Sequence, residues 1–355
     1  MPIDSIVLTL LSAYVIGFLF RRLKVPGGML VGGIIGAAIL NIMWSTAYIP
    51  SVGKIFAQSV AGAFIGSSVK KNELKEMRRI IKPAAILLGS YLVMNLGMGL
   101  LIYAVSPISA PTALFSAVPG GISDIPLIAA DMGANAPQVA VLQFVRLVIG
   151  VGVFPSMIHY LCRDQEQEPG ELNLPPQTSP SNAPVREPEQ WRQFFITLGT
   201  ALLCGIVGYW TGIPAGTLVF ALAGVLLLKI FWGKAFLPLK IKGLAQLISG
   251  AYIGCSIGWA DVLELRFLVL PAVIIIAGYS VFCLLCGYVL ERFCGMERKE
   301  ALLAATPAGA SDMALISMDL GVQSTDLVLL QVLRLIVVSS VFPQVIHVVL
   351  QLLPN

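Results

Sequence analysis

Charged residues are scarce in this sequence. Lys, Arg, Asp and Glu make up 12% of its 355 residues, about half the share expected of a soluble globular protein. Apolar residues make up 57%, and they form stretches long enough to cross a hydrocarbon core of roughly 30 Å. This composition excludes a soluble multidomain protein and predicts a polytopic α-helical membrane protein. In such a chain the net charge of +4 does not indicate nucleic-acid binding.

Histidine and cysteine are also few. Two histidines cannot form a His-rich metal cluster, and the six cysteines are dispersed, mostly within apolar stretches. Cys283 and Cys286 form a C-x-x-C, but their place inside an apolar span favours helix packing over redox or metal chemistry. We therefore expect no metal, no cofactor and no enzymatic activity. We expect no cleavable signal peptide either, because the basic residues at 21–24 follow the first apolar stretch and do not precede it.

The chain is a duplication. When the sequence is shifted by 188 positions its halves superpose without a gap, and 113–159 matches 301–347 with 20 identities in 47 positions. The two histidines of the sequence fall on each other, near segment ends where an interfacial position is expected, and acidic residues inside apolar segments also align. Chance similarity between apolar helices would not align such rare residues. Between the halves, 163–190 is polar and proline-rich, which predicts a flexible linker between domains 1–162 and 191–355.

Each half contains the same series of apolar segments. In the first half they cover about 3–20, 27–44, 50–68, 80–105 and 137–161, with an interrupted segment at 111–133. In the second half they cover about 192–210, 214–232, 240–257, 268–290 and 325–350, with the interrupted segment at 299–321. P-G-G at 119–121 and P-A-G at 307–309 are expected to break the helix of each interrupted segment. Proline removes a backbone hydrogen-bond donor, and glycine permits a bend.

The basic residues indicate that the two repeats are inverted. Lys and Arg gather on the cytoplasmic side of short membrane loops. In the first half they follow the first and third segments, whereas in the second half they follow the second and fourth. Opposite orientations place 19 of the 23 basic residues on the cytoplasmic side. We therefore expect a bacterial inner-membrane protein with both termini outside and the linker in the cytoplasm.

Inversion requires an odd number of crossings in each half, because an even number returns the chain to its starting side. We therefore expect the interrupted segments to be re-entrant hairpins whose tips meet near the bilayer midplane. The predicted fold class is an all-α polytopic membrane protein. It consists of two inverted-topology repeats, each with about five transmembrane helices plus a broken re-entrant helical segment.

Polar residues around each break form the candidate site. Ser123 and Asp124 follow the first break, and we expect Ser123 to cap the second half-helix. Capping alone is the simpler alternative, but an ionisable group near the bilayer centre is costly and favours a functional role. Gln143 and Arg146 share one face of the last segment, with Arg146 about 14 Å deep by helix rise. Its guanidinium is expected to clamp an anion, with a structural ion pair to Asp124 as the alternative.

The duplication repeats this set in the second half. The candidate substrate- or ion-binding residues are Gly120, Gly121, Ser123, Asp124, Gln143, Arg146, Gly309, Ser311, Asp312, Gln331 and Arg334. Asp131 and Asp319 are weaker candidates, with a helix-end role as the alternative. Gln58 and Gln246 lie among small residues, where helix packing is the favoured role. Replacing either arginine by Gln is expected to abolish anion binding and to spare folding.

The duplicated motif resembles that of a known family. A P-G-G break, a small residue followed by an acid, and then Q-x-x-R-L are typical of the AbrB membrane-protein family, also labelled an aidB regulator or an ammonia monooxygenase. The resemblance covers both halves: Gly120, Gly121, Gln143 and Arg146 match the first motif, and Gln331 and Arg334 the second. Ala308 departs from the pattern, which implies a less pliable second tip. The resemblance implies the duplicated membrane fold and specifies the activity less closely.

Inverted repeats, broken helices and midplane charges favour a secondary transporter for a small, anionic solute, with coupling to H⁺ or a cation left open. The alternative is a membrane-embedded regulator or sensor of gene expression that does not transport. A monooxygenase is disfavoured, because two histidines cannot supply the metal ligands of oxygen chemistry. The expected partners are the lipid bilayer and a small-molecule ligand, with no nucleic acid; a homodimer is left open.

Overall fold

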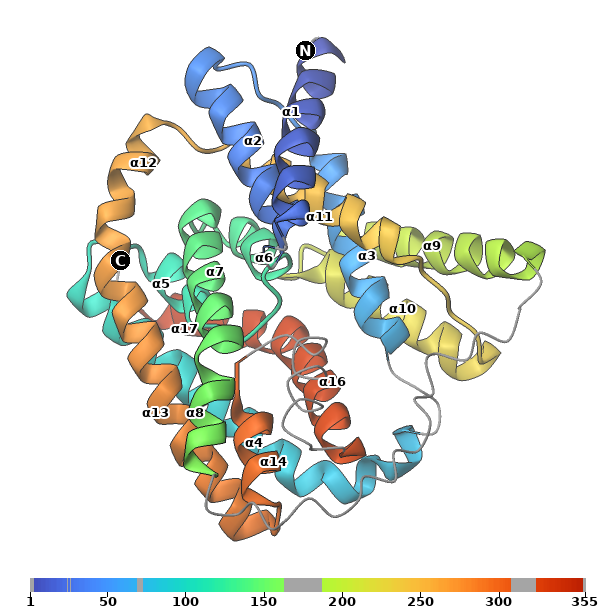
Figure 1. The fold of residues 1–355 in the computed structure, drawn as a ribbon. Helices are drawn as coiled ribbons and strands as arrows, with labels where there is room; N and C mark the ends of the chain where they lie inside the picture. Colours follow the sequence, from blue (N-terminus) through green and yellow to red (C-terminus); the bar gives the residue numbers. More distant parts are fainter. Residues whose placement is uncertain are drawn as a thin grey trace.

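The structure is a computed structural model that describes residues 3–23, 25, 27–68, 73–162, 187–307 and 324–353. Within these residues the regular secondary structure is helical, as the composition predicts (Figure 1). The first repeat contains α1 (Ile3–Arg22), α2 (Gly28–Trp44), α3 (Ser51–Ser68), α4 (Glu73–Val105), α5 (Ala110–Ser116), α6 (Ile125–Asp131), α7 (Ala136–Gly152) and α8 (Phe154–Leu161). The second contains α9 (Glu187–Trp210), α10 (Gly216–Trp232), α11 (Leu239–Gly254), α12 (Trp259–Glu264), the 3-10 helix η2 (Leu265–Leu268), α13 (Val269–Cys294), α14 (Arg298–Ala305), α16 (Thr325–Ser340) and α17 (Phe342–Leu352).

The helices reproduce the duplication. α10 begins and ends 188 residues after α2, and α14 begins 188 residues after α5. The helix bounds follow most of the predicted apolar segments to within a few residues. α9 begins at Glu187, so the last residues of the predicted linker are helical, while 163–186 lies outside the described residues.

The last segment of each repeat is divided into two helices. The sequence predicts single helices over 137–161 and 325–350, but α7 ends before α8 and α16 ends before α17. A Phe-Pro pair begins α8 and α17, and proline cannot donate the backbone hydrogen bond that would continue the preceding helix. The short helices α12 and η2, which precede α13, are also absent from the sequence-based prediction.

Corresponding helices of the two repeats run antiparallel, as the charge pattern predicts. α4 and α13 occupy the same place in their repeats and pack against each other. Near the start of α4, Lys82 Nζ donates a hydrogen bond to the carbonyl oxygen of Phe293, near the end of α13. Further along, the rings of Tyr91 and Phe282 lie 4.5 Å apart. Later residues of α4 therefore contact earlier residues of α13, so the two helices are antiparallel, which is the geometry of inverted repeats.

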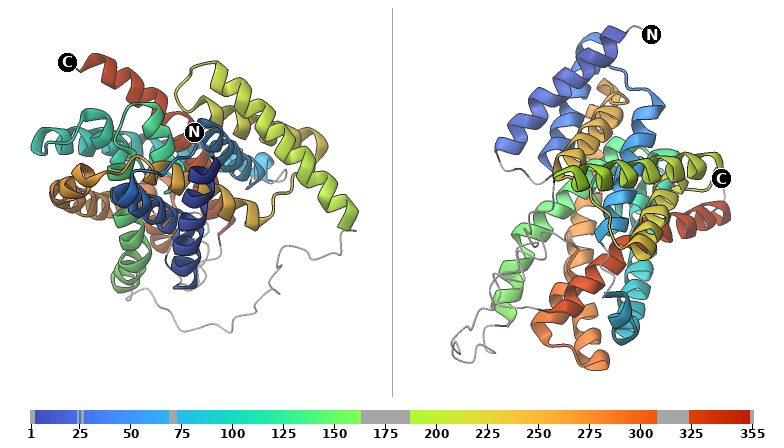
Figure 2. Two further views of the ribbon diagram at one scale, coloured as in Figure 1. Left: turned by 90° about the horizontal axis from the view of Figure 1, so that it is seen from above. Right: turned by 90° about the vertical axis from the view of Figure 1, so that its right-hand side faces the viewer.

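Helices of both repeats combine into two bundles (Figures 1 and 2). The paired bundle consists of α1–α3 and α9–α11, and its main contacts between repeats join α2 to α11 and α3 to α10. The broken-helix bundle consists of α4–α8, α13, α14, α16 and α17, and it holds most of the largest buried hydrophobic cluster. Because each bundle contains helices of both repeats, the surface between the bundles is also built by both.

Glycines bring the helices of the paired bundle close together. A Cβ atom on Gly62 of α3 would lie 2.4 Å from the carbonyl oxygen of Leu218 on α10. Gly250 of α11 holds the equivalent position, where a Cβ atom would lie 2.3 Å from the carbonyl oxygen of Leu30 on α2. Small residues let membrane helices approach at backbone distance. The two contacts are related by the duplication, since Gly62 and Gly250 are 188 residues apart.

Gly62→Ala is expected to destabilise the protein by about 1–3 kcal/mol, because the added methyl group overpacks the contact between α3 and α10. Gly97→Ala on α4 is the matched control, since a Cβ atom there meets nothing within 4 Å and alanine favours a helix. The measurement is the free energy of unfolding in detergent. Equal stability of the two variants would contradict the close packing.

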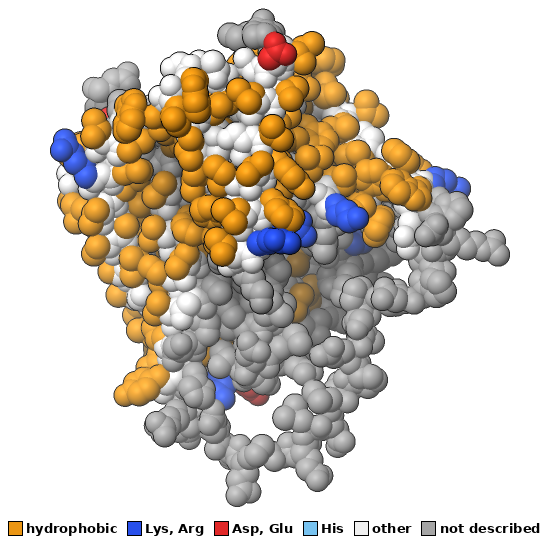
Figure 3. All heavy atoms as spheres, turned by 45° about the horizontal axis from the view of Figure 1, so that its top comes forward, with side chains coloured by type: hydrophobic (Ala, Val, Ile, Leu, Met, Phe, Trp, Pro, Cys, Tyr) orange, Lys and Arg blue, Asp and Glu red, His pale blue; other side chains and the backbone are white. Residues whose placement is uncertain are grey.

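The surface of the described residues fits a membrane protein. Figure 3 shows hydrophobic side chains spread over the visible face, with Lys and Arg in only a few places. Three further apolar helical segments have fewer than 18 residues: α2, α10 and residues Ala136–Gly150 of α7. Five segments are long and apolar enough to cross a membrane: Ile3–Arg22, Ile80–Val105, Gln190–Trp210, Asp261–Cys294 and Asp326–Leu352. These helices indicate a membrane protein, while its sidedness and its number of crossings stay predictions.

Candidate functional site

The helix break of the first repeat lies between α5 and α6, where 117–124 is not helical. Two glycines make the bend compact. A Cβ atom on Gly120 would lie 2.4 Å from the side chain of Ile125, and one on Gly121 would lie 2.5 Å from Asp124 Oδ2. The candidates at the second break lie outside the described residues: Gly309, Ser311, Asp312 and Asp319.

Two side chains of α7 bind the carbonyl groups that the break leaves without helical donors. Gln143 Nε2 donates hydrogen bonds to the carbonyl oxygens of Phe115, at 3.0 Å, and Val118, at 2.9 Å. Arg146 donates from Nη1 to the carbonyl of Val118, at 2.8 Å, and from Nη2 to that of Gly120, at 2.6 Å. Both side chains are buried. Because an unpaired carbonyl in such a place costs several kcal/mol, Gln143 and Arg146 make the break possible.

The second repeat has the same arrangement. Gln331 Nε2 donates to the carbonyl oxygen of Leu303 at 3.3 Å, and Arg334 Nη1 donates to that of Thr306 at 2.6 Å. These two acceptors lie 188 residues after Phe115 and Val118. The Q-x-x-R motif therefore binds the carbonyl end of the first half-helix in both repeats.

One tyrosine completes the set of donors at each break, and it comes from the opposite repeat. The Tyr91 hydroxyl donates to the carbonyl oxygen of Ala305 at 2.8 Å, and the Tyr279 hydroxyl donates to that of Ala117 at 2.9 Å. Both tyrosines are fully buried. The duplication aligns Tyr91 with Tyr279, but sequence reasoning gives them no role, because an internal alignment does not reveal contacts between repeats. Each break is thus held by both halves of the chain.

For the first break, the structure contradicts one alternative, the ion pair of Arg146, and one expectation, the capping role of Ser123. Arg146 forms no ion pair with Asp124, and its terminal nitrogens donate instead to two carbonyl oxygens of the break. Ser123 does not cap α6. Asp124 holds the N-cap position without a side-chain capping bond, and the carbonyl of Ser123 instead accepts a hydrogen bond from the hydroxyl of Ser249 on α11. The proposed pairing of Arg334 with Asp312 involves a residue outside the described part of the chain.

A cavity of about 420 Å³, hereafter the tip cavity, lies beside the first break and between the two bundles. It brings together residues of both repeats. Asp124 is 8% exposed there, so its carboxyl group has little contact with solvent. The predicted candidates that line it are Gly120, Gly121, Ser123, Asp124, Arg146 and Gln246. The candidates Gln143, Gln331 and Arg334 do not line it and serve the backbone of the breaks.

Lys242 of α11 is a lining residue that sequence reasoning misses. Its ammonium group lies 5.7 Å from the centre of the Phe64 ring and acts electrostatically on Asp124. Lys242 lies inside the predicted segment 240–257, but it belongs to a basic cluster that indicates the cytoplasmic side, and this explanation gives it no role in a binding site. One signal was present: the duplication aligns Lys242 with Lys54, a lysine that lies outside the basic clusters.

Asp131 links the two bundles next to the tip cavity. Its carboxylate forms an ion pair with Lys54 and accepts a hydrogen bond from Gln58 Nε2 at 2.7 Å. Asp131 is the last residue of α6 in the broken-helix bundle, whereas Lys54 and Gln58 lie on α3 in the paired bundle. One turn from this network, Ala57 and Leu127 line the tip cavity and belong to one buried hydrophobic cluster. The cavity is therefore closed toward Asp131.

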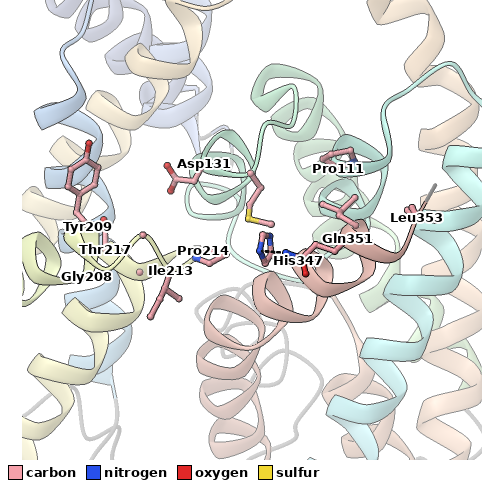
Figure 4. Close-up of a pocket in the computed structure, with 14 residues that line it drawn as sticks. Pro111, Asp131, Gly208, Tyr209, Ile213, Pro214, Thr217, His347, Gln351 and Leu353 are labelled. Atoms are coloured by element: carbon pink, nitrogen blue, oxygen red, sulfur yellow. Dashed lines mark hydrogen bonds between the residues drawn. The ribbon is translucent and has the colours of Figure 1, made fainter. Parts of the chain in front are cut away.

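A larger pocket of about 770 Å³ lies on the far side of Asp131, between α6, the α9–α10 loop and α17 (Figure 4). His347 and Gln351 of α17 face it and share a hydrogen bond of 3.1 Å. Its one charged lining group, Asp131, is already paired with Lys54. The tip cavity is the better candidate site despite its smaller volume, since it joins charged groups of both bundles at a helix break.

Metal and thiol chemistry find no support among the described residues. No group of three or more His, Cys, Asp or Glu side chains is placed there to hold a metal ion. Cys283 and Cys286 are free and buried in α13, and Cys283 Sγ lies 3.5 Å from the carbonyl oxygen of Leu302. The C-x-x-C thus packs against α14.

Known proteins are similar to this chain over most of its length. The chain matches the family described as "Transition state regulatory protein AbrB" over residues 1–161 and 50–350. It is 24% identical over 329 residues to "Putative regulator AbrB" of Escherichia coli (strain K12), covering 90% of this chain and 88% of that protein. It is 20% identical over 293 residues to "Uncharacterized protein YhjN" of Bacillus subtilis (strain 168), covering 81% and 76%. With both halves matched and the duplicated break, glutamine and arginine in place, the chain belongs to the AbrB family.

Proposed function

We propose that this protein is a secondary transporter that carries a small anionic solute through the tip cavity. In this mechanism the two bundles move against each other and open the cavity alternately to the two sides of the membrane. The interrupted segments act as re-entrant hairpins with their breaks near the midplane. The observation that carries the proposal is the cavity itself, which ends at a helix break and is lined by charged side chains of both bundles.

The charges that line the tip cavity favour an anion. Arg146 and Lys242 supply two positive charges, and Asp124 supplies one negative charge. In a cavity within the membrane, such charges interact more strongly with a solute than they would in water. The excess of positive charge attracts an anion, and the carboxylate keeps the binding from becoming too tight for release.

Asp124 is the coupling group in this proposal. When it takes up a proton, the positive charges of Arg146 and Lys242 are no longer opposed, so anion binding strengthens as the pH falls. Asp124→Asn is expected to keep anion uptake and to remove most of its dependence on pH. Initial uptake rates at neutral and mildly acidic pH measure this effect. An unchanged pH dependence in the variant would assign the coupling to another group.

The network around Asp131 acts as the gate on one side of the cavity. The ion pair with Lys54 and the hydrogen bond from Gln58 join α6 to α3, and Ala57 packs near Leu127 one turn further in. A solute can pass toward Asp131 only when these contacts separate. Movement of one bundle against the other would break them together, since each joins α3 of the paired bundle to α6 of the broken-helix bundle.

A regulator without transport is the second candidate, and the name of the Escherichia coli relative favours it. In that case the same cavity would bind a ligand and pass the signal to another protein. The two functions differ in one measurable respect, because a transporter moves its ligand across a sealed membrane.

Uptake into proteoliposomes tests the proposal. The purified protein is reconstituted, and uptake of radiolabelled phosphate, sulfate, succinate and an alkanesulfonate is measured against empty liposomes. We expect saturable uptake of at least one anion and a loss of at least tenfold, about 1.4 kcal/mol, in Lys242→Gln. Lys240→Gln, an exposed lysine on the same helix that does not line the cavity, is the control. Anion binding without uptake would favour the regulator.

A further inference from the structure

We infer that the tip cavity accepts a monovalent organic anion with an apolar body, and that it rejects phosphate, sulfate and dicarboxylates. This inference rests on the proposed function and adds the chemical class of the solute. It follows from the hydrogen-bond donors that the cavity has already used and from the apolar surface that remains.

The first argument is the state of Arg146. Phosphate and carboxylate binding sites use the two terminal nitrogens of a guanidinium group as a fork. In this structure Nη1 and Nη2 of Arg146 donate to the carbonyl oxygens of Val118 and Gly120. Arg146 contributes its positive charge to the cavity, but the break engages one N–H group of each terminal nitrogen and Nε is buried, so a two-pronged grip on an oxyanion would have to compete with these carbonyl bonds. Lys242, a single ammonium group, remains as the cation that can contact a solute directly.

The second argument concerns the hydroxyl groups. The Ser249 hydroxyl donates to the carbonyl oxygen of Ser123 at 3.3 Å, and the Ser68 hydroxyl donates to that of Ile65 at 2.6 Å. Both hydroxyl groups belong to the lining, and their protons are therefore engaged by the protein. The Ser123 hydroxyl and the Gln246 amide are the other polar side-chain donors of the lining. They are fewer than the donors that a divalent oxyanion loses with its hydration shell, which makes its burial unfavourable.

The third argument is the apolar wall. Val60 and Phe64 of α3, Leu127 of α6, Leu147 of α7 and Val332 of α16 line the same cavity. Four helices contribute this apolar wall, and the Lys242 ammonium group supplies a positive charge at one position on it. A cavity of about 420 Å³ with one contact cation and apolar walls matches a single anionic head group attached to a hydrocarbon body.

The test is binding of linear alkanesulfonates to the purified full-length protein by isothermal titration calorimetry. Ethane-, butane- and hexanesulfonate keep one negative charge at all relevant pH values and differ in apolar length. We expect affinity to rise about fourfold or somewhat less for each added methylene group until the cavity is full. Lys242→Gln should lower the affinity for hexanesulfonate at least tenfold, and Lys240→Gln should leave it unchanged.

Val332→Thr provides a second variant, because threonine has nearly the shape of valine and adds a hydroxyl group to the wall. It should reduce the gain per methylene group while the protein remains folded. Tighter binding of phosphate, sulfate or succinate than of hexanesulfonate would overturn the inference, as would affinity that does not depend on chain length or an absence of binding by the whole series. Uptake of phosphate into proteoliposomes would preserve the proposed transport and reject this solute class. Binding of hexanesulfonate in the predicted order without uptake would preserve the solute class and reject transport.

Discussion

Arg146→Gln is expected to destabilise the protein by about 2–3 kcal/mol, because the carbonyl groups of Val118 and Gly120 lose charged hydrogen-bond donors. These contacts replace the sequence-based expectation that the substitution spares folding. The carbonyl of Val118 keeps the Gly120 N–H and Gln143 Nε2 as donors, whereas the described residues offer the carbonyl of Gly120 no donor besides Arg146. The same substitution at Arg334 is expected to act on the second repeat through Thr306. The measurement is the free energy of unfolding in detergent.

Two variants separate this effect from a general loss of positive charge. Arg146→Lys retains one cationic donor and is expected to restore part of the stability. Arg266→Gln removes an exposed arginine and is expected to change the stability by no more than about 0.5 kcal/mol. If Arg146→Gln were as stable as Arg266→Gln, the carbonyl contacts would have little energetic importance, and a direct role in anion binding would regain support.

Charge reversal in the gate is expected to have the largest effect on transport. Lys54→Asp places a second carboxylate beside Asp131, and Asp131→Lys places a second ammonium group beside Lys54. Like charges at such a contact cost several kcal/mol, so each single variant should lower uptake at least tenfold and hold α3 and α6 apart. The variant with both changes restores the ion pair in reverse and should recover uptake to within about threefold of the original protein.

Labelling of a cysteine at Ala57 reports the state of the gate directly. Ala57 is buried and lines the tip cavity next to the gate. In a background without the six native cysteines, Ala57→Cys should react with a membrane-impermeant maleimide from the Asp131 side faster in the single charge-reversal variants than in the double variant. Equal reaction rates in all of them would show that Asp131 does not control access.

Much of the fold can be predicted because it depends on residue types that are visible in the sequence. The duplication, the break of the first repeat and the apolar segments follow from rare residues that align at one offset and from proline and glycine within apolar runs. Most of the second predicted break lies outside the described residues. The inversion follows from the basic residues, and the antiparallel pair α4 and α13 agrees with it. The sequence does not predict the exchange of helices between two bundles, since this depends on contacts between repeats.

The sequence predicts several residues of the candidate site, but it does not predict their hydrogen-bond partners. Asp124 and Arg146 share a cavity, but the partner of Arg146 is backbone and not the carboxylate. Backbone acceptors are invisible in a sequence, because any residue can supply them. The sequence gives no site role to Tyr91, because its hydroxyl acts on the opposite repeat. It gives none to Lys242, because a cytoplasmic basic cluster already accounts for that charge.

Two-sided labelling of one cavity residue tests the central claim most directly. Ala61 lines the tip cavity on α3, and Ala61→Cys in the cysteine-free background can be treated with an impermeant maleimide from either side of sealed vesicles. Alternating access predicts reaction from both sides, with each reaction slowed by hexanesulfonate. Reaction from one side alone, with and without the anion and in the gate variants, would show that the cavity never opens to the other side and would contradict transport.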